Sequence, residues 1–206
     1  MHLRRLLYGS SSLLLSCLVL CGLLLTGSPA ALAQGGMAGT PTPAPTSIPP
    51  ADSLNALLSV MESEVVSAAE AMPADKYDFA PPTSMGLYTG VRSFSAQVRH
   101  LTEANYAYFR SFGVPGAVDS KTIEALKTKD DIVRALKDSY AFAHAAIGTI
   151  TPENAFLSVP GPPAWKLTHA SVAAFVIAHS MDHYGQMVEY LRMNGIVPPA
   201  SQPRSK

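Results

Sequence analysis

Four stretches of this chain repeat apolar residues at intervals of three and four, and this spacing constrains the fold more than any other feature. It places each set of apolar side chains on one face of a helix. No stretch of useful length shows the period-two alternation of a half-buried strand. The sequence therefore predicts an all-α fold, and helices of this length predict a four-helix bundle. The four stretches are residues 52–72, 89–112, 128–147 and 168–194.

Residues at the ends of these stretches carry capping signals. Asp52 or Ser53 can cap the first helix. Thr128 and Asp131 have the spacing of a capping box at the start of the third helix. Gly195 is typical of a left-handed residue that ends the fourth helix. The connection between the second and third helices is long enough to cross the bundle.

The first 33 residues have the three regions of a secretory signal peptide. A basic start, MHLRR, precedes the apolar run LLLSCLVLCGLLL, and the segment ends in an A-x-A pattern at residues 31–33. We therefore expect Gln34 to begin a periplasmic or secreted protein that has no stable membrane span after cleavage. An uncleaved anchor is one alternative, although the run is shorter than the roughly 20 residues of a bilayer span. A lipoprotein acylated on Cys17 is a weaker one, because the apolar run continues past it.

The remainder of the chain divides by composition. Residues 34–50 are rich in Pro, Gly, Ala and Thr and predict a flexible linker. Residues 51–200 form the expected helical domain, and residues 201–206 a polar tail. Both cysteines, Cys17 and Cys21, lie in the predicted signal peptide. The mature domain would therefore have no disulfide and no thiol nucleophile, so its stability must come from core packing or a bound metal.

Charge argues against two classes of partner. The chain has 15 basic and 15 acidic residues, and loss of Arg4 and Arg5 with the signal peptide leaves 13 basic residues against 15 acidic ones. Nucleic acids and anionic membranes attract a strongly basic surface. We therefore expect no nucleic-acid partner and no polybasic surface for binding a membrane.

Two histidines in the last predicted helix have metal-ligand spacing. His179 and His183 are four residues apart, so their rings lie about 40° apart around the helix axis and can converge on one ion. This short motif also arises by chance, and both residues then belong to the polar edge of the core. His100 favours a metal site, because it lies midway along another helix on its buried side. Three protein ligands leave an open position for water or substrate, as in catalytic sites.

Other residues are weaker candidates. Glu103 follows His100 by one turn and is a possible fourth ligand or acid–base group, although a carboxylate there is more often solvated. Asp182 is a second possible proton carrier, and Asp182 or Gln186 can orient a histidine ring through its free N–H. His144 near a helix end and His169 in a first helical turn have more ordinary surface or capping interpretations.

These motifs together resemble the DinB-like superfamily of four-helix metalloproteins. The resemblance rests on VRHLTEAN in the second helix and HSMDHYGQMVEYLRMNGIVPP in the fourth, and extends over about residues 52–199. It implies an up-down-down-up bundle with a divalent zinc, nickel, manganese or iron ion on His100, His179 and His183.

Some members of this superfamily are metal-dependent thiol transferases or isomerases. The resemblance thus implies a small-molecule substrate or thiol cosubstrate, and the leading hypothesis is a metal-dependent transferase or hydrolase. The alternative is a non-catalytic metal- or ligand-binding module. The expected export separates this chain from the cytoplasmic thiols that such enzymes use. The oligomeric state stays open, a homodimer included.

Overall fold

The structure is a computed structural model that describes residues 46–203. The expected signal peptide, most of the linker and the last three residues of the tail lie outside the described residues, so the predictions for them stay predictions. Residues 46–203 contain α-helices, short 3-10 turns and one isolated bridge between Ser158 and Thr168. The predicted all-α class is confirmed.

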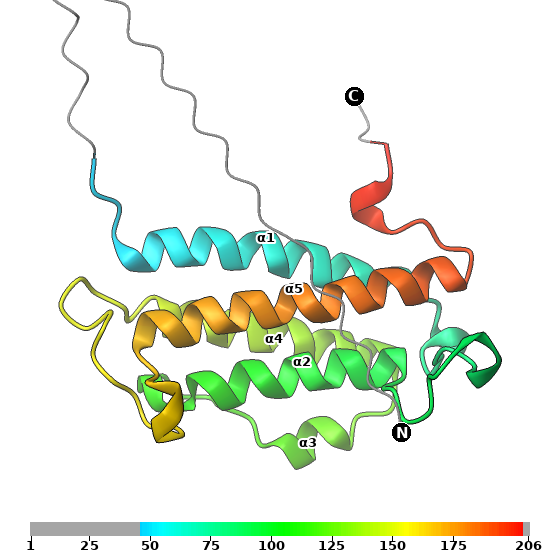
Figure 1. The fold of residues 1–206 in the computed structure, drawn as a ribbon, viewed down its shortest axis with the longest axis horizontal. Coiled ribbons are helices and arrows are strands. Elements are labelled where there is room, and N and C mark those ends of the chain that lie inside the picture. Colours follow the sequence, from blue (N-terminus) through cyan, green and yellow to red (C-terminus); the bar gives the residue numbers. More distant parts are fainter. Residues whose placement is uncertain (1–45, 204–206) are drawn as a thin grey trace, which may run out of the picture. The chain divides into compact units, whose positions relative to one another are not determined.

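Four long helices and one short helix make up this domain. The short helix lies in the crossover between the second and third long helices (Figure 1), where the sequence pattern indicated only a connection. The elements are α1 (Pro50–Ala71), α2 (Phe94–Phe109), α3 (Ser120–Glu124), α4 (Lys129–Ile147) and α5 (His169–Met193).

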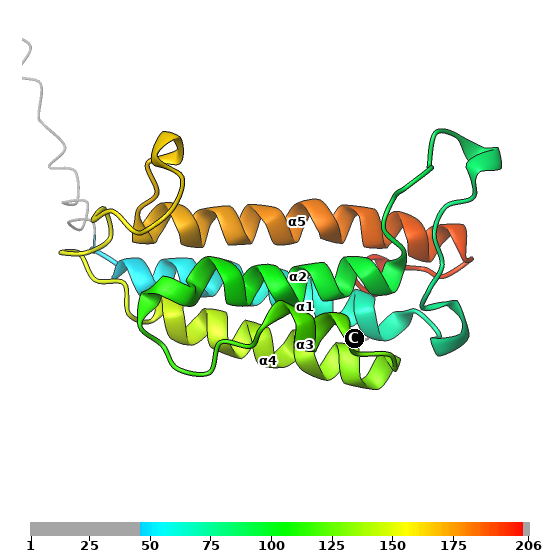
Figure 2. The same cartoon turned by 90° about the horizontal axis from the view of Figure 1, so that it is seen from below.

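Each long helix packs against two others. α1 contacts α4 and α5, and α2 contacts the same two helices (Figure 2). α1 and α5 run in one direction, whereas α2 and α4 run in the opposite direction (Figure 1). The antiparallel packing of α2 on α5 sets the middle of one helix against the middle of the other, which is where the histidines lie.

The apolar stripes predicted from the sequence meet between the helices. Full burial of one such side chain contributes about 1.5–3 kcal/mol relative to exposure. We expect a core of this size to stabilise the bundle without help from a metal. Its fully buried members include Leu58, Val65, Phe94, Leu101, Leu136, Tyr140, Val176 and Leu191.

The helix starts differ in part from the expected ones. α1 begins at Pro50 without a side-chain cap, so the expected caps Asp52 and Ser53 lie inside the helix instead. Proline serves this position well, because the first helical N–H has no partner in any case. α2 begins at Phe94, later than predicted, because the Ser93 side chain caps it.

The capping box of α4 is half formed. The Thr128 hydroxyl accepts from the Asp131 N–H at 3.1 Å, as expected. The Asp131 carboxylate, however, accepts from the Thr128 hydroxyl at 2.6 Å rather than from its backbone. At the end of α5, Gly195 has φ +75°, which confirms the predicted left-handed residue.

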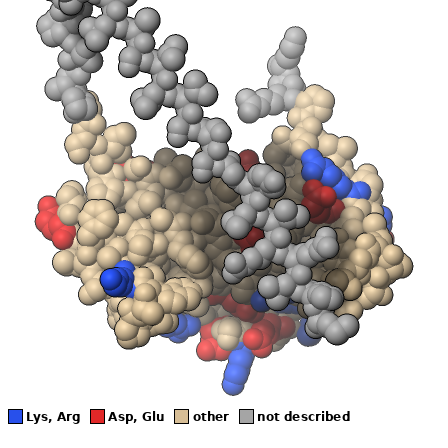
Figure 3. Space-filling view, in the orientation of Figure 1, with Lys and Arg blue, Asp and Glu red and all other residues tan. Residues whose placement is uncertain are grey.

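Charged side chains are sparse on one visible face of the described domain. No helix within residues 46–203 has the length and apolar character needed to cross a bilayer. On the face seen in Figure 3, the coloured Lys, Arg, Asp and Glu side chains gather toward the edges, and the remaining described surface is mostly uncharged. No continuous basic patch is visible among the described residues on this face.

Candidate metal centre

Three histidines converge where α2 crosses α5. The Nε2 atom of His179 lies 3.2 Å from Nε2 of His100 and 3.0 Å from Nε2 of His183. One ring nitrogen from each residue falls within 4.8 Å of the other two. His179 and His183 meet because they are one turn apart on α5, whereas His100 reaches them only through the packing of α2 on α5.

These separations fit a shared ion. Two nitrogens about 2.1 Å from one ion are roughly 3.0 Å apart at a right angle and roughly 3.4 Å apart at the tetrahedral angle. The distances from His179 to its two neighbours are in this range. Three imidazole nitrogens also form a donor set that first-row divalent metals accept.

A chain of side-chain amides holds the His183 ring. The Nδ1 atom of His183 lies 2.5 Å from Oε1 of Gln97. The Gln97 amide donates to Oε1 of Gln186 at 2.7 Å, and the Gln186 amide donates to the Asp182 carboxylate at 3.2 Å. Because Gln97 offers His183 an acceptor, Nδ1 carries the hydrogen and the lone pair of Nε2 faces the cluster.

Gln97 was missed by the sequence interpretation. Gln186 and Asp182 were candidates for orienting a ring; in the structure Gln186 contacts Gln97, and Asp182 contacts Gln186. Gln97 is fully buried on α2, three residues before His100, so it lies on the same face of that helix. The sequence contained one signal for this role, namely a polar residue on the buried face of the helix, three residues before His100.

Burial keeps the cluster neutral. It lowers the pKa of both His100 and His183 to about 4 and also lowers the pKa of His179. Like charges add to this effect, since Arg92 lies close enough to disfavour protonation of all three rings. Near neutral pH, the rings are therefore unprotonated and their lone pairs are available to a metal.

The two candidate carboxylates lie outside the ring contacts. Glu103 lines a cavity of about 360 Å³ together with His100, and burial followed by the charge of Glu124 raises its pKa. Asp182 is exposed and holds Gln186. Within residues 46–203, no hydrogen bond joins either carboxylate to a ring of the cluster.

The other two histidines of the domain lie elsewhere. His144 on α4 contacts α1, with Nδ1 2.7 Å from Asn55 Oδ1 and Nε2 3.1 Å from Glu62 Oε2. His169 packs its ring against Phe112 at the start of α5, with the ring centroids 4.8 Å apart. Neither residue joins the cluster.

Two aromatic rings border the cluster on one side. The Phe175 ring stacks on His179, with an interplanar angle of 11° and centroids 5.9 Å apart. The Tyr108 ring meets His179 edge-on at 6.2 Å. Phe175 precedes His179 by one helical turn, a spacing that the sequence showed but that equally suits a core residue.

A family model described as the DinB superfamily matches residues 57–187. This match spans well over half of the chain and includes His100, His179 and His183. The chain belongs to the DinB superfamily. The resemblance inferred from the sequence is thereby confirmed. No curated protein matches the chain significantly.

The DinB-superfamily match also includes most of the surroundings of the cluster. Gln97, Glu103, Tyr108, Phe175 and Gln186 all fall within the matched residues. About the first two turns of α1 and the end of α5 lie outside it. Membership in the DinB superfamily and the three converging rings together suggest metal binding, whereas the reaction and the substrate belong to the proposal that follows.

Proposed function

We propose that this protein binds one divalent metal ion through the Nε2 atoms of His100, His179 and His183. The observation that carries the proposal is the convergence of these atoms at 3.0–3.2 Å around His179. Their neutral state supports it, because a neutral imidazole has a lone pair free for a metal, and the Gln97 contact supports it by directing that of His183 Nε2 toward the cluster. A donor set of nitrogens alone suits zinc, nickel or iron better than manganese, which prefers oxygen ligands.

We further propose that the site is catalytic and acts as a transferase or hydrolase on a small molecule, with a thiol as one cosubstrate class. A divalent ion with three protein ligands and an open position acidifies a water or thiol that it holds. The cavity shared by His100 and Glu103 has a volume typical of small-molecule sites. Because its pKa is raised, Glu103 is suited to hold a proton beside that cavity and to transfer it.

A non-catalytic metal-binding module is the second candidate. It is favoured by one observation, namely that neither Glu103 nor Asp182 contacts a ring of the cluster among the described residues. In such a module, the metal would stabilise the α2–α5 contact and no proton transfer would be needed.

Metal analysis and a chelator assay separate these two functions. Protein purified from its native compartment should contain about one equivalent of zinc, nickel or iron, as expected for one three-ligand site. Turnover of thiols with electrophiles, or hydrolysis of small esters and amides, should be lost with chelator and restored by metal. Metal-dependent melting without any turnover would support the module. Protein that binds no divalent metal would contradict both.

We also propose that the protein acts outside the cytoplasm, as a periplasmic or secreted protein. The support is the order of basic, apolar and A-x-A segments in residues 1–33. N-terminal sequencing of the native protein should give Gln34. Intact Met1 in soluble cytoplasmic protein would overturn this proposal.

A further inference from the structure

A second cavity lies beside the metal cluster and has a different character. Its volume is about 480 Å³, within the range of small-molecule sites. The end of α2 forms one wall and the loop before α5 forms the other. Tyr108, Trp165, Leu167, Val172, Pro160 and Pro162 are among the lining residues.

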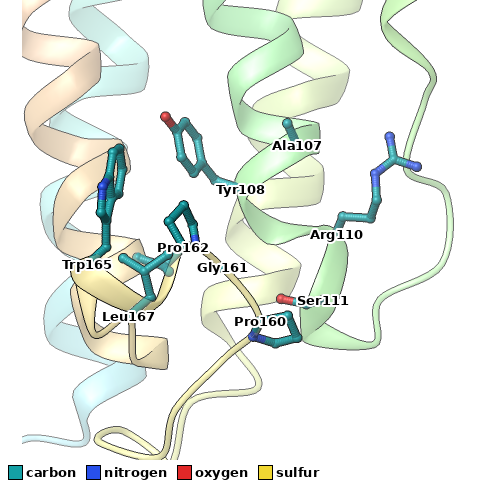
Figure 4. Close-up of a pocket in the computed structure, with 10 residues that line it drawn as sticks. Ala107, Tyr108, Arg110, Ser111, Pro160, Gly161, Pro162, Trp165 and Leu167 are labelled. Atoms are coloured by element: carbon teal, nitrogen blue, oxygen red, sulfur yellow. The ribbon is translucent and has the colours of Figure 1, made fainter.

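Aromatic rings shape this cavity. Figure 4 shows Trp165 and Pro162 on the loop before α5, and Tyr108 reaching toward them from α2. Phe175 links the two, with ring centroids 5.0 Å from Tyr108 and 6.1 Å from Trp165. Trp165 is 54% exposed, so its position is not explained by burial in the core.

The loop that carries Trp165 is held in one conformation. Val159 N–H donates to the Leu167 carbonyl at 3.0 Å and closes the loop at its base. Gly161 packs so closely on Leu167 that a Cβ atom would lie 2.6 Å from Leu167 Cδ1. Lys166, next to Trp165, has a left-handed φ of +48°, a costly conformation for a side chain of this kind. The loop therefore places an exposed indole at the edge of the cavity.

The cavity lies next to the candidate metal centre. Phe175 contacts the indole and also stacks on His179. The cavity lined by His100 and Glu103 shares Tyr108 with this one. The only charged side chain of the lining, Arg110, points away from the rings in Figure 4 and donates to the Val118 carbonyl at 3.4 Å. The lining is thus mostly apolar and, apart from Arg110, uncharged.

We propose that this cavity binds a neutral, planar apolar group of the substrate, such as an aromatic or conjugated ring, against Tyr108 and Trp165. The two aromatic rings of the lining favour stacked or edge-on contacts with a flat ligand. The reacting end of the molecule then points toward the histidine cluster. This orientation rests on the proposed function. Ring binding itself requires no metal.

The chain contains a single tryptophan, Trp165, so its fluorescence reports directly on the cavity. The probes are N-phenyl-1-naphthylamine, which is neutral, and 8-anilinonaphthalene-1-sulfonate, which has the same aromatic rings and a negative charge. The neutral probe should quench Trp165 in a saturable one-to-one titration and bind at least about tenfold more tightly than the sulfonate. Equal affinity for the two probes, or no saturable quenching, would overturn the proposal.

Three variants test the location. Tyr108→Ala should weaken binding of the neutral probe about tenfold. Ala107→Phe should block the cavity from an exposed helical position while leaving the core intact. Phe156→Ala removes an aromatic ring that is 82% exposed and does not line the cavity, and it should bind as the unmodified protein does. Unchanged binding in both Tyr108→Ala and Ala107→Phe would place the probe elsewhere and overturn the proposal.

Two controls separate this inference from the metal proposal and from other occupants. His179→Ala protein, treated with chelator, should still bind the neutral probe. Metal binding without probe binding would refute this inference alone, whereas probe binding without metal binding would refute the proposed function alone. Probe binding that appears only on dilution, or only after removal of residues 34–45, would assign the cavity to a second copy or to the chain's own segment and overturn the proposal.

Discussion

Histidines lie at two contacts between antiparallel helices, the α1–α4 seam and the α2–α5 seam. The two seams differ in the partners of the ring nitrogens. Between α1 and α4, both ring nitrogens of His144 have an oxygen partner, from Asn55 and Glu62. Between α2 and α5, the Nε2 atoms of three histidines face one another, and Nδ1 of His179 is buried without a protein partner in the described structure.

The difference shows how a structural histidine differs from a candidate ligand. A buried polar atom is costly unless it is hydrogen-bonded, and the α1–α4 seam meets that requirement with its own side chains. In the α2–α5 seam, a side-chain oxygen meets only Nδ1 of His183, through Gln97, and the three Nε2 atoms have only one another as close neighbours in the described structure. An ion shared by those nitrogens would stabilise the arrangement.

The largest expected effect comes from removing a ring of the cluster. His100→Ala, His179→Ala and His183→Ala should each lower divalent-metal affinity by more than the roughly 10- to 100-fold that loss of an outer hydrogen-bond partner costs. His144→Ala and His169→Ala should change it little. Calorimetric titration with zinc and nickel measures this, and circular dichroism checks that each metal-free variant remains helical. Unchanged affinity in His100→Ala would remove the distinction between the two seams.

A smaller effect is expected from Gln97→Leu. Loss of the acceptor for His183 Nδ1 should lower metal affinity about 10- to 100-fold. Asn105→Leu is the matched control, because Asn105 is equally buried on α2 but bonds Ser139 of α4 at 3.1 Å. Both variants should lose stability, but only Gln97→Leu should lose metal affinity. Equal affinities in the two variants would contradict an orienting role for Gln97.

The metal-free protein should lose stability as pH falls from about 6.5 to about 4. The unfolded chain binds protons on His100 and His183 near pH 6.5, whereas the folded protein does so only near pH 4. The free energy of unfolding therefore decreases as the pH falls through this window. Urea denaturation with chelator at several pH values measures this change. The free energy of unfolding should decrease less over this window when all three cluster histidines are replaced by alanine. The same pH dependence of the free energy of unfolding in both proteins would contradict a pKa shift caused by burial.

The smallest expected effect belongs to the other seam. His144→Ala removes two partly exposed hydrogen bonds and should lower the free energy of unfolding by about 1 kcal/mol. Thermal unfolding monitored by circular dichroism measures this change. A large fall in metal content of this variant would show that the two seams are coupled.

Some of the fold and site followed from local patterns. The helical segments, Gly195 as a left-handed residue, and the shared direction of His179 and His183 depend only on the helix repeat and on backbone sterics. The short α3 helix was missed because five residues are too few for a periodic pattern, and tertiary contacts stabilise such a segment.

The sequence by itself determined the helical class, the family resemblance and the candidate triad of His100, His179 and His183. Only the tertiary structure decided that Gln97 holds His183, that Glu103 stays clear of the rings, and that His144 is satisfied by α1. The physical reason is the separation along the chain of the residues in contact. Spacing within one helix follows from its own geometry, whereas contacts between helices depend on how the packed core sets their register and rotation.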